Sequence, residues 1–60
     1  MVIKVEYEDG NPPDIVSYKK SKDAFERLGA LSRLYKLKAL FITSNFIYVR
    51  ISKKEFKDVL

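Results

Sequence analysis

The sequence predicts a small α+β domain in which one helix packs across a sheet made of two hairpins. Residues 2–8 alternate apolar and polar side chains, which is typical of a half-buried strand. Residues 46–51 also alternate like a strand, with Ile47, Val49 and Ile51 on one face, but the other face carries two aromatic rings and an arginine. Residues 21–36 repeat apolar side chains at three- and four-residue steps, which is typical of an amphipathic helix. The predicted order is β-β-α-β-β followed by a short C-terminal helix. All of it belongs to one compact domain, residues 1–60, with no linker.

The first predicted hairpin joins residues 2–8 to residues 15–20. One face of its first strand carries the larger apolar residues, Ile3, Val5 and Tyr7. In the second strand, Val16 and Tyr18 lie on one side and Ile15, Ser17 and Lys19 on the other. The connecting residues 9–14 are turn formers: Gly and Asn tolerate positive φ, and proline cannot donate to a ladder.

The predicted helix begins at Ser21, a favourable N-cap residue, and Asp23 in its first turn suits the helix dipole. Its apolar residues fall within one contiguous arc of the helical wheel, and we expect that arc to face the sheet. The arc consists of Ala24, Phe25, Leu28, Leu31, Leu34 and Tyr35. Four of these are predicted core residues, namely Phe25, Leu28, Leu31 and Tyr35.

Residues 40–43 and 46–51 are two further β-rich runs around Ser44 and Asn45. They predict either a second hairpin with a two-residue turn or one long bent strand. Beyond them, the sequence from Ser52 to Glu55 matches a capping box, which predicts a short helix carrying Phe56, Val59 and Leu60. This β-β-α-β-β order resembles a minimal β-grasp, the plan of protein G and ubiquitin, in element order alone. Such a resemblance implies an arrangement and no function.

Composition excludes several classes of site. The 60 residues include no cysteine and no histidine, so disulfides, thiolate metal sites and histidine catalysis are absent. The net charge of +4 is uneven, because residues 1–14 carry −3 and residues 15–60 carry +7. A basic excess is compatible with a polyanion partner. No run approaches the roughly 20 apolar residues of a membrane span, and the start of the chain does not resemble a signal peptide, so we expect a cytoplasmic protein with no membrane partner.

The sequence contains no catalytic signature, and we expect no enzymatic activity, cofactor or small-molecule substrate. The serines have no nucleophile motif around them, and no Gly-rich phosphate loop is present. The acidic loop of residues 8–14 lacks the ligand spacing of a calcium loop, and a turn-forming composition accounts for its residues. We therefore expect no metal site.

The candidate site is the sheet face opposite the helix. On the last strand this face carries Phe46, Tyr48 and Arg50, and we expect Lys4 and Lys19 beside them. A protein partner, or a second copy of this chain, would use the two rings as buried anchors. Single-stranded or duplex nucleic acid is the alternative, because rings stack on bases and cations contact phosphates. A separate basic cluster, Lys53, Lys54 and Lys57, is a second candidate for phosphate contacts.

Overall fold

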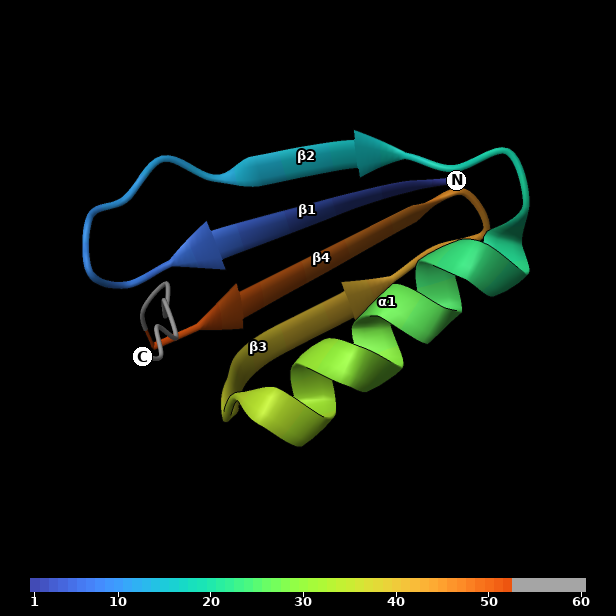
Figure 1. Cartoon of the computed structure of the whole chain (residues 1–60). Helices are drawn as coiled ribbons and strands as arrows, with labels where there is room; N and C mark the ends of the chain where they lie inside the picture. Colours follow the sequence, from blue (N-terminus) through green and yellow to red (C-terminus); the bar gives the residue numbers. More distant parts are fainter. Residues whose placement is uncertain (53–60) are drawn as a thin grey trace, which may run out of the picture.

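The computed structural model describes residues 1–52, which form a four-stranded mixed sheet with one helix on one face (Figure 1). The strand order is β2-β1-β4-β3, with β1 and β4 parallel and both outer pairs antiparallel. The predicted β-β-α-β-β layout is confirmed, and the parallel central pair is the one that a β-grasp arrangement requires. The predicted C-terminal helix lies outside the described residues. The elements are β1 (Val2–Tyr7), β2 (Asp14–Ser17), α1 (Ser21–Leu34), β3 (Leu37–Ile42) and β4 (Phe46–Ile51).

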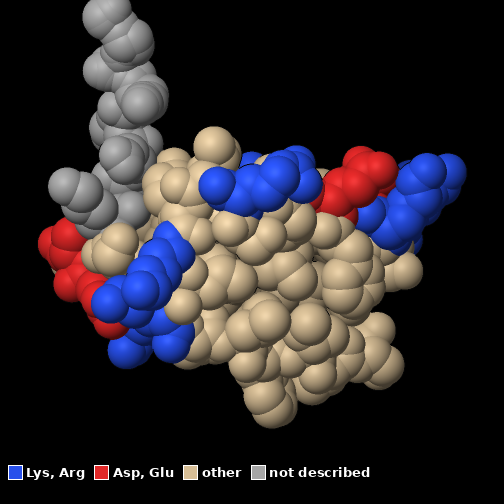
Figure 2. Space-filling view, turned by 90° about the horizontal axis from the view of Figure 1, so that it is seen from below, with Lys and Arg blue, Asp and Glu red and all other residues tan. Residues whose placement is uncertain are grey.

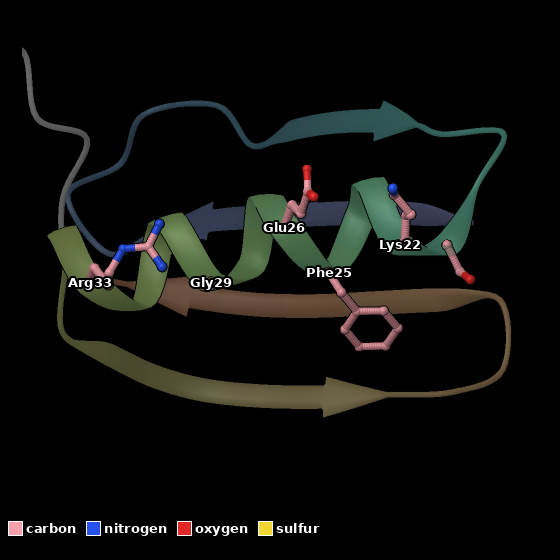
Figure 3. Close-up of a pocket in the computed structure, with 6 residues that line it drawn as sticks. Lys22, Phe25, Glu26, Gly29 and Arg33 are labelled. Carbon is pink, nitrogen blue, oxygen red and sulfur yellow. The ribbon is translucent and has the colours of Figure 1, made fainter.

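The core lies between α1 and the two central strands. The parallel register sets Ile3 beside Ile47 and Val5 beside Val49, and all four side chains are buried. Because alternate strand residues share a face, the predicted apolar face of β1 and its counterpart on β4 both meet the helix. Figure 3 shows α1 lying along β1 and β4, with β2 and β3 on either side. The buried residues of this core are Ile3, Val5, Ala24, Leu31, Ile47, Val49 and Ile51.

The apolar arc of α1 is wider than the surface that covers it. Leu31 is buried and Leu28 is half-buried, as predicted, but Phe25 is 43% exposed and Leu34 is 72% exposed. Phe25 and Leu34 are nine positions apart, which at about 100° per residue puts them at opposite edges of the arc. The prediction that Phe25 is a core residue is therefore wrong, because two central strands cover only the middle of the arc.

Several element boundaries differ from the prediction. Lys20, not Ser21, is the N-cap residue: its backbone is extended and its carbonyl accepts the Asp23 N–H at 3.1 Å. Strand β2 ends at Ser17, so Lys19 lies beyond the strand where residues 19–20 bend toward α1. Strand β3 begins at Leu37, three residues before the predicted run of residues 40–43, and a register shift lies between Leu37 and Ala39.

The two hairpin loops are held by short-range hydrogen bonds. The antiparallel pairing of β3 with β4 confirms the hairpin and excludes the long bent strand. At its turn the Thr43 N–H donates to the Phe46 carbonyl at 2.8 Å, and the Asn45 N–H donates to Thr43 Oγ1 at 3.5 Å. In the first loop Gly10 has a φ of 90°, a conformation that side chains disfavour, and Asp9 accepts the Asn11 N–H at 3.0 Å.

A hydrogen bond from Tyr7 Oη to Asp14 Oδ2 joins the end of β1 to the start of β2. Burial, and then the Asp14 carboxylate, raises the pKa of Tyr7 from 10.0 to about 12. The neutral phenol therefore stabilises the fold fully below pH 10, and this contribution is lost as the pH rises toward 12. We expect the urea midpoint of the wild-type protein to fall across that window and the midpoint of Tyr7→Phe to fall less. An equal fall of the urea midpoint with pH in the two proteins would contradict the assignment of this pH dependence to Tyr7.

Candidate binding face

The register of the sheet gathers the predicted site residues on one side. We define the outer face as the sheet surface opposite α1, and no element among residues 1–52 lies on it (Figure 1). Lys4 pairs with Ile15 on β2 and with Tyr48 on β4, and Tyr48 pairs with Phe41 on β3. Paired residues share a face, so these four side chains form one row across the outer face. The adjacent outer-face positions are Val2, Glu6, Ser17, Ala39, Phe46 and Arg50.

Glu6 is the centre of a polar network on the outer face. The Tyr48 hydroxyl donates to Glu6 Oε1 at 2.6 Å. Arg50 Nη2 lies 3.5 Å from the same oxygen, and Lys4 Nζ lies 3.5 Å from Glu6 Oε2. The Lys4, Glu6 and Arg50 side chains remain substantially exposed, so water screens both ion pairs and they contribute little to stability. The network orients the Tyr48 ring and the guanidinium more than it stabilises the fold.

The protonation equilibria of this network follow from those contacts. The hydrogen bond from Tyr48, with the charges of Lys4 and Arg50, holds the pKa of Glu6 below its usual value despite some desolvation. The same hydrogen bond raises the pKa of Tyr48. Near neutral pH the outer face therefore presents a carboxylate that accepts from a neutral phenol and lies between two cations.

Two apolar residues of the outer face were missing from the sequence prediction. Ile15 is 63% exposed and Phe41 is 60% exposed, at the two ends of the row that contains Tyr48. Ile15 alternates with Ser17 in the sequence, which placed it on the correct side of its strand without marking it as a site residue. Phe41 lies between Leu40 and Ile42, and three consecutive large apolar residues give no signal of which one faces outward.

The remaining predicted site residues are not brought into this network. Lys19 is exposed in the bend after β2. The candidate phosphate-contact residues Lys53, Lys54 and Lys57 lie outside the described residues. Phe46 is half-buried next to the β3–β4 turn and makes the outer face aromatic at that end.

A broad, open depression follows the solvent-facing side of α1 (Figure 3). Phe25 points from the helix toward β3, and Gly29 lies between it and Arg33. A Cβ at Gly29 would meet only Arg33 Nη1 at 3.6 Å, an ordinary contact, so the described chain does not require glycine there. The other residues that line the depression are polar or charged: Ser21, Lys22, Glu26 and Arg33.

Comparison with known proteins adds no functional information. The chain matches no protein-family model, and neither a curated protein nor a solved structure is significantly similar to it. Among residues 1–52, no three acidic side chains come together in a way that could hold a metal ion. The described helix is too short and too polar to cross a membrane. The class defined by fold and site is thus a one-helix, four-stranded mixed-sheet domain with an open aromatic face.

Proposed function

We propose that this chain is a small, non-catalytic binding protein that holds another protein against its outer face. The observation that supports this best is the row in which Tyr48 lies between Ile15 and Phe41, which are 63% and 60% exposed. Aromatic residues and arginine are enriched in the centres of protein interfaces. In such a complex Phe46 and Tyr48 are the buried anchors. Arg50, already oriented by Glu6, donates directed hydrogen bonds to the partner.

The charges of the outer face favour a protein over a nucleic acid. Lys4 and Arg50 are the cations nearest the rings, and each lies 3.5 Å from a Glu6 oxygen. A phosphate would have to compete with that carboxylate for both cations and would be repelled by it. Sheets that hold single-stranded nucleic acid combine stacking rings with a positively charged groove. Nucleic-acid binding through the same rings is the alternative, and the experiment must distinguish it from protein binding.

The test is the double substitution Phe46→Ala with Tyr48→Ala, compared with the wild-type protein as bait in a cell extract. We expect the variant to keep its far-ultraviolet circular dichroism, because neither ring is in the core, and to lose the proteins that the wild type retains. Phe25→Ala is the matched control, since it removes a half-exposed ring from the helix side and should retain them. Equal retention by all three proteins would overturn the proposal.

Titration of a labelled single-stranded oligonucleotide with the protein tests the nucleic-acid alternative. We expect no anisotropy change on adding the wild-type protein at low salt. Binding that weakens steeply with added salt and disappears in the double variant would assign the outer face to nucleic acid instead.

A further inference from the structure

The two edges of the sheet differ in how well they are protected against pairing. Strand β2 has only four residues, starts at an aspartate after two prolines, and is followed by two lysines. Short strands, prolines and charges are the usual means of blocking an edge. Strand β3 has six residues, and residues 39–43, which are its last four residues and the following threonine, contain neither a charge nor a proline. Within the described residues 1–52, the β3 edge is therefore the one open to another strand.

The open edge carries apolar side chains on both sides of the sheet. Leu40 and Ile42 face the helix side at 49% and 43% exposure, and Phe41 faces the outer side. Phe25 points toward this strand from α1 (Figure 3). Figure 2 views the molecule from this side and shows an uncharged area in the middle, with Lys and Arg at its margins. Exposed apolar edges of this kind pair readily with another strand.

The backbone groups available at this edge can be assigned from the hairpin register. The Thr43 N–H donates to the Phe46 carbonyl, so Thr43 and Phe46 form a hydrogen-bonded pair. Hydrogen-bonded and non-hydrogen-bonded pairs alternate along an antiparallel ladder. Phe41, two residues earlier, therefore bonds to β4 opposite Tyr48. The N–H and C=O groups of Leu40 and Ile42 point the other way, toward the open edge.

We infer that β3 pairs antiparallel with β3 of a second copy of this chain, which joins the two sheets into one of eight strands. The side chains of residues 39–43 follow the same order of types when read from either end: small, aliphatic, aromatic, aliphatic, small. A two-fold axis at Phe41 sets Leu40 of one copy opposite Ile42 of the other, so that their outward backbone groups form four hydrogen bonds. The two Phe41 rings then meet at a non-hydrogen-bonded pair, where side chains are closest. This self-complementarity favours a second copy over an unrelated strand.

The size of the seam indicates a reversible dimer. Phe25, Leu40, Phe41 and Ile42 expose together roughly 400 Å² per chain, taking about 200 Å² for a fully exposed large side chain. A standard stable interface buries about 800 Å² per partner. Pairing at β3 takes only Phe41 from the outer face and leaves Ile15, Phe46 and Tyr48 uncovered, so this inference does not depend on the partner proposed for that face.

Two charge substitutions test the seam by mass, using sedimentation from micromolar to millimolar protein. We expect the wild-type mass to rise from 7.0 kDa toward twice that value. Phe41→Lys sets two like charges opposite each other and should weaken association about tenfold or more. Ile15→Lys is the matched control, because Ile15 has nearly the same exposure on the outer face of the other edge strand and should associate like the wild type.

Charge complementation and hydrogen exchange complete the experiment. Phe41→Glu should also be monomeric, and a mixture of Phe41→Glu with Phe41→Lys should regain the dimer mass. In the wild type, exchange at the amides of Leu40 and Ile42 should slow with rising concentration, whereas exchange at the Phe41 amide should not change. The inference is overturned if the mass of the wild type stays at 7.0 kDa at all concentrations, or if exchange at the Leu40 and Ile42 amides does not change with concentration. It is also overturned if Ile15→Lys weakens association as much as Phe41→Lys does. The last outcome would assign self-association to the outer face.

Discussion

Replacing Ile47 by alanine is expected to remove most of the folding free energy of this domain. Ile47 has no exposed surface and lies on a central strand, paired with Ile3 on one side and Ile42 on the other. Truncating a buried isoleucine costs about 2–5 kcal/mol, because apolar burial is lost and the cavity closes only partly. A chain of 60 residues has about 3–9 kcal/mol in total at 0.05–0.15 kcal/mol per residue.

The measurement is urea unfolding followed by circular dichroism, with Ile15→Ala as control. Ile15 is the same residue type on the outer face of an edge strand and is 63% exposed, so its truncation should change stability by about 0.5 kcal/mol or less. We expect Ile47→Ala to be partly unfolded without urea and Ile15→Ala to resemble the wild type. A larger cost at Ile15 than at Ile47 would mean that the strands present the opposite faces to the helix, as a one-residue register slip produces.

That the sequence predicted the correct faces of β1, β2 and β4 follows from local chemistry. Side chains alternate with a period of two, so Ile47, Val49 and Ile51 share a side whatever the strand pairs with. The same alternation placed Tyr48 and Arg50 together on the outer face. It gave no such signal in β3, where Leu40, Phe41 and Ile42 are three consecutive large apolar residues.

The contacts within the outer face could not be predicted, because they depend on register between distant segments. Glu6 and Tyr48 are 42 residues apart and meet only because β1 and β4 run parallel with Lys4 beside Tyr48. A two-residue shift that set Glu6 beside position 52 instead of Arg50 would keep every side chain on its face and still separate the carboxylate from the hydroxyl. Likewise, the exposure of Phe25 and Leu40 depends on where α1 lies across the sheet, and helical periodicity does not determine that position.

That position is fixed in part by a small residue, which leads to the second large expected effect. Ala24 is completely buried in the cluster formed by α1 and the central strands, whereas the neighbouring Phe25 is displaced toward β3. We expect Ala24→Leu to cost about 1–3 kcal/mol or more, because the added carbons have no space unless the helix moves away from the sheet. The measurement is again the urea midpoint.

Ala30→Leu is the matched control for Ala24→Leu. Ala30 is on the same helix and only half-buried, and leucine and alanine have similar helix propensities, so the two substitutions differ mainly in the space available. A small effect at Ala30 with a large one at Ala24 would mean that close approach of α1 to β1 and β4 holds the fold together. Equal small effects would mean that α1 can move across the sheet. In that case, the exposure of β3, and the seam inferred from it, would depend on a helix position that the core does not fix.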